Sequence, residues 1–303
     1  MNWINAFEII CYLLTVLLLG DIAKQRNQVE LRLFFAATMA GFILEILAVR
    51  ATDIYHYSND YFFSIGAPPN QFPVFGGLMW GALAVCGFRI ARKFSGSSFE
   101  ISLFAGWLVV SMDLLLDVAA IRLNGGFWIW DGRVLSWDIN HHVFMSVIWV
   151  NFLGYLFETP AVVYLTLRLN KLAEKSRLMA ILAVLGAGLG AVITVGVGSS
   201  LSLLLNKISD EWFAVVAFLV LWMAILVKLV AQIARHWHTL TLRVNQDFVL
   251  GIFWAVIYGY CLAALWALGV FHTNIAYGLF AVFIALATLL MSFVSTNAYA
   301  ESD

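Results

Sequence analysis

The chain has 303 residues, of which 63% are hydrophobic and only 12% are charged, and its formal net charge is −1. An ordinary soluble domain is about half apolar and about a quarter charged, so this composition excludes a soluble globular protein and indicates an integral membrane protein. The near-zero net charge also argues against the broad basic field that nucleic-acid binding needs, so no nucleic-acid partner is expected.

The apolar stretches predict the spanning elements, because about 20 apolar residues are enough to cross a bilayer as a helix. In chain order there are nine: 3 to 20, 32 to 50, 70 to 90, 99 to 122, 142 to 168, 178 to 204, 211 to 234, 248 to 271 and 275 to 295. Short alternating strands, the pattern of a membrane barrel, are missing from the sequence. The predicted fold is therefore all-α, a polytopic helix bundle. We expect residues 1–170 to form a five-helix core with the active site, and residues 171–303 to add four helices of unassigned role.

The distribution of Lys and Arg predicts the orientation, since cytoplasmic loops accumulate these residues. With the N-terminus outside, the cytoplasmic segments hold Lys24, Arg26, Arg32, Arg89, Arg92, Lys93, Arg168, Lys171, Lys175, Arg177, Lys228, Arg235 and Arg243. The outer segments hold Arg50, Arg122, Arg133 and Lys207. This ratio of 13 to 4 predicts an outer N-terminus and a cytoplasmic C-terminus. We expect the protein in a bacterial inner (cell) membrane.

The three cysteines are expected to be packing residues. Cys11, Cys86 and Cys261 all lie within apolar runs and form no CxxC or metal-ligand spacing. The sequence therefore predicts neither disulfides nor a metal site. The first apolar run has no basic leader and no small-residue cleavage site, so it is expected to remain as a helix.

Three acidic residues lie inside apolar runs and are the leading candidates for chemistry. A carboxylate at mid-membrane depth costs roughly 2.5 to 3.5 kcal/mol. Glu45 lies five residues before Arg50, and Asp117 lies five residues before Arg122. At 1.5 Å per residue both acids are about 8 Å below the same predicted boundary. Asp113 is one helical turn deeper on the same face as Asp117. The spacing predicts that the three acids share a pocket.

Two loops above this predicted pocket are unusually aromatic. The loop before the third helix contains Tyr57, and the loop before the fifth contains Trp128 and Trp130. Trp and Tyr favour the membrane interface, which explains part of this enrichment. We expect the remaining aromatic residues to form a lid. The fifth predicted helix adds His142 near its outer end and Asn151 deeper.

The order of these residues is similar to that of a known family. The residues that carry the similarity are Glu45, Tyr55-His56-Tyr57-Ser58, Gly66, Pro73, Trp80, Asp113, Asp117, Gly126, Trp128, Trp130, Trp149, Asn151, Gly154 and Tyr155. Together they resemble the membrane-bound carotenoid-biosynthesis hydratases (CruF type), with a more distant likeness to membrane isoprenoid and lycopene cyclases. The resemblance covers residues 35–165, about half of the chain. The sequence departs from the family at Val118, where a proline is usual, and over residues 136–142.

The resemblance implies addition of water across a terminal double bond of a linear carotenoid without a redox cofactor. The implied partners are a hydrophobic isoprenoid or lipid substrate and the membrane lipids. The chemistry also fits the residues themselves: an acid protonates an alkene carbon, and the resulting cation is shielded until water or a second alkene attacks it. Burial disfavours the charged form of a carboxyl group, which keeps a buried acid available as a proton donor.

Each residue of the predicted site has a role in this scheme. Asp113 or Asp117 donates the proton, Glu45 and the remaining Asp supply counter-charge, and Asn151 or His142 places water. Aromatic faces stabilise the cation, as they do ammonium groups. The aromatic lining is expected from Tyr57, Trp80, Trp128, Trp130 and Tyr155.

Other interpretations stay open. The aspartates could be structural, hydrogen-bonded to a partner such as Ser111, and Glu45 could pair with Arg50 or Arg122. From a different class of function, a proton-coupled membrane transporter of a small or lipidic solute also buries acids. The glycines of the sixth predicted helix, Gly186, Gly188, Gly190, Gly196 and Gly198, either break that helix, as in carriers, or allow close helix packing. The sequence does not predict an oligomeric state.

Overall fold

The computed structural model describes residues 2–51, 55–130, 134–242 and 248–296. Within these ranges nine helices are long and apolar enough to cross a membrane, which confirms the predicted all-α membrane fold. They are α1 (Trp3–Gln25), α2 (Gln28–Ala51), α3 (Val74–Ala91), α4 (Ser98–Ala120), α5 (Trp149–Ala173), α6 (Arg177–Ile208), α7 (Trp212–Arg235), α8 (Phe248–Ala267) and α10 (Ile275–Phe293).

Short elements connect these helices. The helical turns are η1 (Leu123–Gly125), η2 (Trp237–Thr239) and α9 (Val270–Thr273). The strands are β1 (Tyr55–Tyr57), β2 (Ser64–Ile65), β3 (Phe72–Pro73), β4 (Trp128–Trp130), β5 (Val143–Phe144), β6 (Val147–Ile148), β7 (Leu240–Leu242) and β8 (Val294–Thr296). They form four antiparallel two-stranded ribbons, β1 with β4, β2 with β3, β5 with β6 and β7 with β8.

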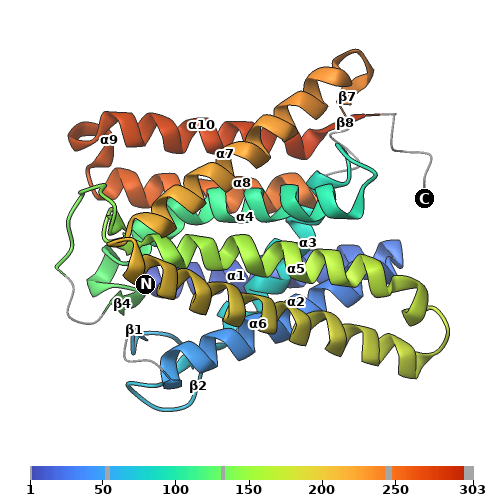
Figure 1. Cartoon of the computed structure of the whole chain (residues 1–303), viewed down its shortest axis with the longest axis horizontal. Helices are drawn as coiled ribbons and strands as arrows, with labels where there is room; N and C mark the ends of the chain where they lie inside the picture. The colour runs from blue at the N-terminus through green and yellow to red at the C-terminus, as the bar shows by residue number, and fades with distance from the viewer. Residues whose placement is uncertain (1, 52–54, 131–133, 243–247, 297–303) are drawn as a thin grey trace.

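The long helices lie side by side along one axis of the molecule (Figure 1). We call the end that holds the start of α1 and the ribbon of β1 and β4 the N-terminal end, and the end that holds β7 and β8 the opposite end. Helix α4 is the most buried of the nine spans, whereas α6 is the most exposed. Large apolar side chains make up most of the exposed face of α6, as expected of a surface in contact with lipid.

Helix α5 begins later than the sequence predicts. Its apolar run starts at residue 142, but the helix starts at Trp149 because the preceding residues fold into the hairpin of β5 and β6. The turn of this hairpin places Met145 and Ser146 at φ values of 50° and 72°. Positive φ values are incompatible with a right-handed helix, so α5 cannot extend toward residue 142 although this segment is apolar.

The described chain begins and ends at opposite ends of the bundle, as an odd number of spans requires. Two of the basic residues that support the predicted orientation, Arg133 and Arg243, lie outside the described residues. The cytoplasmic side of the bundle therefore stays a prediction from the remaining basic residues. The three cysteines are buried and unbonded, which confirms their prediction as packing residues.

Candidate functional site

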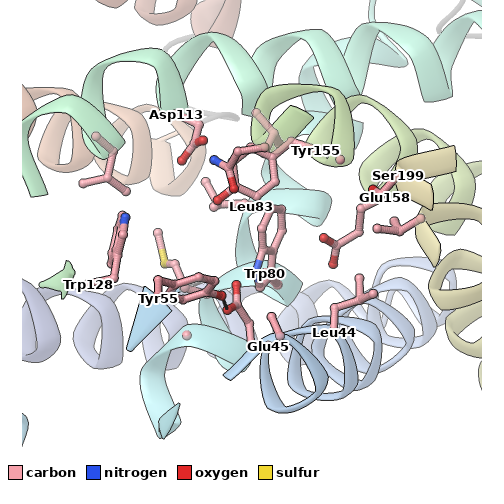
Figure 2. Close-up of a pocket in the computed structure, with 18 of the residues that line it drawn as sticks. Leu44, Glu45, Tyr55, Trp80, Leu83, Asp113, Trp128, Tyr155, Glu158 and Ser199 are labelled. Atoms are coloured by element: carbon pink, nitrogen blue, oxygen red, sulfur yellow. Dashed lines mark hydrogen bonds between the residues drawn. The ribbon is translucent and has the colours of Figure 1, made fainter. Parts of the chain in front are cut away.

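A cavity of about 310 Å³ lies within the bundle toward its N-terminal end, next to the ribbon of β1 and β4, whose Tyr55 and Trp128 border it (Figure 2). Its walls come from α1 to α6, so α6 contributes although it lies beyond the predicted five-helix core. Most of the lining is apolar. The predicted site residues that line it are Glu45, Tyr57, Trp80, Asp113, Trp128, Trp130, Asn151 and Tyr155.

The ribbon of β1 and β4 forms the roof of this cavity. Tyr55 pairs with Trp130, and Tyr57 pairs with Trp128. Because successive side chains of a strand point to opposite faces, these four aromatic side chains share one face, and all four line the cavity. The predicted lid is therefore a β-ribbon that joins the two aromatic loops. Tyr55 was missed as a site residue, although its i, i+2 relation to Tyr57 was a usable signal.

The lid is also tied to the first helix. Glu8 of α1 is fully buried and accepts hydrogen bonds from the backbone N–H groups of Phe62 and Phe63, at 2.7 and 3.0 Å. The hydroxyl of Tyr12 donates a third hydrogen bond to Glu8, at 3.2 Å. Glu8 thus satisfies the backbone of the loop that follows β1, a structural role for an acid outside the cavity.

Glu45 of α2 is hydrogen-bonded to the roof. Its Oε2 accepts from the hydroxyl of Tyr57 at 2.7 Å and also from the hydroxyl of Tyr55. Burial raises the pKa of both tyrosines, with the nearby Glu45 as the next cause, so both remain neutral donors. Glu45 is half-buried and lines the cavity.

Arg122 does not serve as the partner of Glu45. Its guanidinium donates to the backbone carbonyls of Val118 and Met145, at 2.7 and 3.0 Å. The same group lies over the ring of Trp137, 4.1 Å from its centroid. Arg122 therefore organises the loop that leads into α5, and Glu45 is held by hydroxyl groups.

Asp113 and Asp117 of α4 lie one turn apart and are near enough to hydrogen-bond to each other. Asp113 lines the cavity and is 6% exposed, whereas Asp117 lies behind it and is fully buried. The amide of Asn151 on α5 donates to Oδ2 of Asp117 at 2.6 Å. Among the described residues, Oδ2 of Asp113 and Oδ1 of Asp117 have no hydrogen-bond partner. A proton shared between the two carboxyl groups would satisfy both atoms.

Ser111 does not tie off this pair. Its hydroxyl accepts a hydrogen bond from the indole of Trp222 at 2.9 Å, on the side of α7. The structural alternative for the aspartates therefore has no support from Ser111.

The side wall of the cavity depends on a glycine. The ring of Trp80 on α3 lies against Tyr155 on α5, with the ring centroids 4.9 Å apart. A methyl group at Gly41 of α2 would lie only 2.5 to 2.8 Å from Trp80. Gly41 thus leaves the space in which Trp80 reaches the cavity.

The part of the cavity wall that α2 and α6 form lies near the outer surface of the bundle. Leu44 and Ala48 of α2 line one side of it, and Val195, Ser199 and Leu203 of α6 line the other. Leu203 is 51% exposed, so a single side chain faces both the cavity and the outside of the bundle. This arrangement offers an apolar ligand a lateral route from the bilayer.

His142 lies outside the cavity. It is exposed, it is not part of the cavity wall, and its Nδ1 lies 2.5 Å from a carboxylate oxygen of Glu211. The hairpin of β5 and β6 separates it from Asn151. The structure thus brings together nine of the ten predicted site residues, eight as lining and Asp117 behind Asp113, but not His142.

Glu158, which was not among the predicted site residues, also lines the cavity. It is 4% exposed, and its Oε1 has no hydrogen-bond partner among the described residues. Its position seven residues after Asn151 was the available signal, because residues i and i+7 share a helix face.

The glycines of α6 allow close packing and do not break the helix, which runs without interruption from Arg177 to Ile208. A methyl group at Gly188 would lie 2.8 Å from the carbonyl oxygen of Ala36, and one at Gly198 would lie 2.6 Å from the ring of Phe157. The helix break that would favour a carrier is therefore not found in α6.

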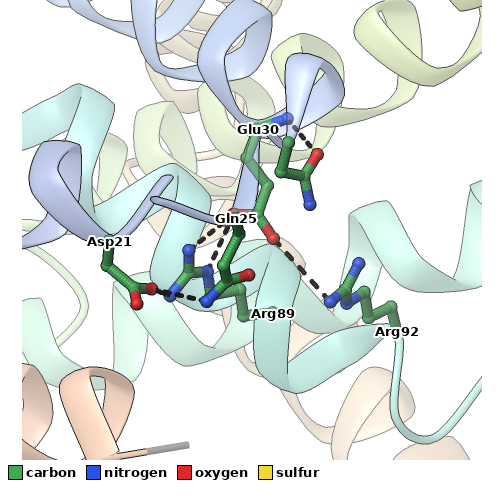
Figure 3. Close-up of polar contacts among 6 residues, drawn as sticks. Asp21, Gln25, Glu30, Arg89 and Arg92 are labelled. Carbon is green, nitrogen blue, oxygen red and sulfur yellow. Dashed lines mark hydrogen bonds and ion pairs between the residues drawn. The ribbon is translucent and has the colours of Figure 1, made fainter. Parts of the chain in front are cut away.

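The opposite end of the bundle also buries acids, but these are paired with arginine (Figure 3). Glu30 is fully buried, and its Oε2 accepts from Nε and Nη2 of Arg89 at 3.0 and 2.6 Å. Nη1 of Arg89 lies 2.6 Å from Asp21, and Arg92 lies 3.8 Å from Glu30. This network joins α1, α2 and α3 and requires no ligand.

No group of three or more His, Cys, Asp or Glu side chains in the described part of the chain has the geometry to hold a metal ion. No family model, curated protein or solved structure matches this chain. The likeness to the carotenoid hydratases therefore rests on the order of the residues alone, and the function has to be argued from the cavity.

Proposed function

We propose that this protein is a membrane enzyme that hydrates or cyclises an isoprenoid alkene by acid catalysis. The observation that supports the proposal is the environment of Asp113. This residue faces a largely apolar cavity and has Asp117 beside it, and the lining residues of the cavity include no basic side chain. A carboxyl group in such a place is suited to donate a proton to a substrate that cannot itself hydrogen-bond.

The reaction begins with transfer of the proton of Asp113 to one carbon of the alkene. A C–H bond forms, the second carbon becomes a tertiary cation, and Asp113 becomes a carboxylate. Glu45 and the faces of Trp80 and Tyr155 stabilise the positive charge. Asn151 holds Asp117 in place, so that the aspartate pair keeps its geometry while the proton moves.

The cation then has two possible fates. In hydration, water adds to the cation and loses a proton to a carboxylate, which restores the acid and gives an alcohol. In cyclisation, an internal double bond attacks the cation, and a neighbouring carbon loses a proton to a carboxylate, which gives an isomer of the substrate. Neither route requires electron transfer, so the residues of this chain are sufficient without a redox cofactor.

The substrate reaches the site from the bilayer between α2 and α6, where Leu203 faces both the cavity and the lipid. We further propose that the N-terminal end faces outward and the C-terminus lies in the cytoplasm of a bacterium. This orientation is supported by the basic residues, since most Lys and Arg lie in the segments of the opposite end.

The test is conversion of acyclic carotenoids and of acyclic isoprenoid alcohols by the full chain in proteoliposomes prepared in deuterated water. Protonation of carbon predicts that the product contains solvent deuterium at the protonated position. Asp113→Asn is expected to reduce turnover by a factor on the order of 100 to 10,000, because the amide has no acidic proton. The matched control is Asp210→Asn, an exposed acid in the turn between α6 and α7, which should convert substrate as the unchanged protein does.

Two outcomes would reject the proposal. One is unchanged turnover in Asp113→Asn, and the other is a product without solvent deuterium. A proton-coupled carrier predicts instead that the unmodified solute accumulates inside the vesicles when a proton gradient is applied, with no new C–H bond.

A further inference from the structure

The cavity contains a second polar position that the proposed reaction does not use. Asn151, Tyr155 and Glu158 lie on one face of α5, and all three line the cavity. Seven residues separate Asn151 from Glu158, which is about 10 Å along the helix axis. Glu158 is therefore two turns farther from the N-terminal end than the level at which Asn151 holds Asp117.

Glu158 points into the cavity beside Ser199 of α6 (Figure 2). The hydroxyl of Ser199 lies over Gly154, where a methyl group would be 3.8 Å from its Oγ. Glu158 is 4% exposed, and Oε1 is buried without a hydrogen-bond partner among the residues described. A buried acceptor of this kind costs free energy unless a ligand supplies a donor.

The lining defines which polar group fits. The lining residues of the cavity include no Lys, Arg or His, so phosphate, diphosphate or carboxylate groups would find no countercharge there. An ammonium group would have to cross hydrocarbon to enter between α2 and α6, which is costly. A neutral hydroxyl group avoids both penalties and can donate its hydrogen to the carboxyl group of Glu158.

We propose that Glu158 and Ser199 form a second subsite that binds the hydroxyl group of an isoprenoid alcohol, whose alkene end lies against Asp113. The placement of the alkene end against Asp113 rests on the proposed function. Binding of the hydroxyl group at Glu158 and Ser199 does not depend on the reaction and can be measured without it. The substrate class is thereby narrowed to prenyl chains with a hydrogen-bond donor at one end and a double bond at the other. The hydroxyl lies on the side of the lateral opening, since Ser199 and Leu203 belong to the same wall of α6.

The test compares two probes that differ only in the donor. Farnesol carries a hydroxyl group, and farnesyl methyl ether keeps the chain and the oxygen but cannot donate. Binding to the full chain in lipid nanodiscs is measured by quenching of tryptophan fluorescence, because Trp80, Trp128 and Trp130 line the cavity. The unchanged protein is expected to prefer farnesol by about tenfold, the worth of one buried hydrogen bond to a carboxyl group.

Substitutions at Glu158 and Ser199 test whether these residues cause the preference for farnesol over farnesyl methyl ether. Glu158→Ala should abolish it, and Ser199→Ala should reduce it. Glu158→Gln should bind the ether better than the unchanged protein does, because the amide can donate to the ether oxygen. Glu174→Gln, an exposed acid at the end of α5, is the matched control and should keep the full preference for farnesol.

Equal affinity for the two probes in the unchanged protein would overturn the subsite, and so would a preference that survives in both Glu158→Ala and Glu158→Gln. Folding of each variant is checked by its melting temperature, and Ser199→Ala, a small change on an exposed helix, keeps the test informative if Glu158→Ala does not fold. Asp113→Asn separates the two proposals: it should lose turnover but retain the preference. A preference for farnesol without any turnover would leave the subsite standing and reject the proposed reaction.

Discussion

Buried acids have different partners at the two ends of the bundle. At the opposite end, Glu30 is fully buried and is held by two nitrogen atoms of Arg89. At the N-terminal end, Asp117 is equally buried but lies between Asp113 and an amide, and no described ion pair includes either aspartate. The comparison separates acids that hold helices together from acids that the fold alone does not need.

The difference has an energetic meaning. A buried carboxyl group without a cation costs stability, whereas a matched pair recovers part of its desolvation. Four carboxyl groups without a described cation partner lie around or beside one cavity: the half-buried Glu45 and the buried Asp113, Asp117 and Glu158. Groups that are costly to bury and are gathered in a cavity are typical of functional sites. This clustering is the reason to look for chemistry at the N-terminal end only.

The largest expected effect is the loss of stability when the ion pair of Arg89 and Glu30 at the opposite end is broken. Arg89→Met leaves Glu30 and Asp21 without their main partner and should lower the free energy of unfolding by about 3 to 5 kcal/mol, measured by equilibrium denaturation in detergent. Asp113→Asn removes no cation partner and should change stability by less than about 1 kcal/mol. The matched control for Arg89 is Arg235→Met, an exposed residue at the end of α7.

The comparison between the two ends fails if the effects are reversed. A stable Arg89→Met protein would mean that the fold does not depend on the pairing of Glu30 with Arg89. A collapse of Asp113→Asn, with turnover lost only because the protein is unfolded, would make the aspartate pair structural, as the polar interhelical alternative proposes.

The second expected effect concerns how Glu45 is held. The double variant Tyr55→Phe with Tyr57→Phe removes both hydroxyl donors to Glu45 but keeps both aromatic rings. An ordinary hydrogen bond contributes about 0.5 to 1.5 kcal/mol, so the loss of both bonds should lower turnover of the isoprenoid substrate by about fivefold to 150-fold. Tyr164→Phe is the control, because the Tyr164 hydroxyl accepts from Arg168 at the opposite end of α5.

The same double variant has a second readout in its pH dependence. Burial raises the pKa of Tyr55 and Tyr57, so the folded protein holds their protons at a pH where the unfolded chain has released them. The stability that these phenols contribute is complete below their unfolded pKa of about 10 and declines as the pH rises above it. The unchanged protein should lose stability more steeply above about pH 10 than the double variant. Parallel slopes would show that the two hydroxyls are not buried.

Much of this fold follows from the sequence because apolar length is a direct property of the residues. All nine spans were predicted, and the four-residue spacing of Asp113 and Asp117 already placed them on one helix face. The expectation that Glu45 and Asp117 lie at the same depth required only the rise per residue and the helix directions. These inferences depend on contacts within a helix or on distance from a boundary, both of which are local.

The remainder depends on pairings between distant segments. Strands β1 and β4 have three residues each, too few for an alternating pattern, and helices α3 and α4 lie between them in the chain. Glu158 lines the cavity because α6 lies beside α5 and Ser199 of α6 forms the neighbouring part of the wall. The sequence gives the spacing of Glu158 from Asn151, but it does not show that a cavity lies beside Glu158.

The smallest effect is expected from His142, the predicted residue that the structure places elsewhere. His142 contacts Glu211, which is 69 residues away along the chain, and nothing near His142 in the sequence indicated this contact. Both side chains are about half exposed, and exposed pairs contribute about 0.2 to 1 kcal/mol. His142→Ala should therefore change stability by less than about 1 kcal/mol and leave turnover within about twofold, and Glu211→Gln should behave in the same way. If His142→Ala lost turnover as Asp113→Asn does while Glu211→Gln did not, the imidazole would have to act in the reaction, and the hairpin of β5 and β6 would have to move to bring it to Asn151.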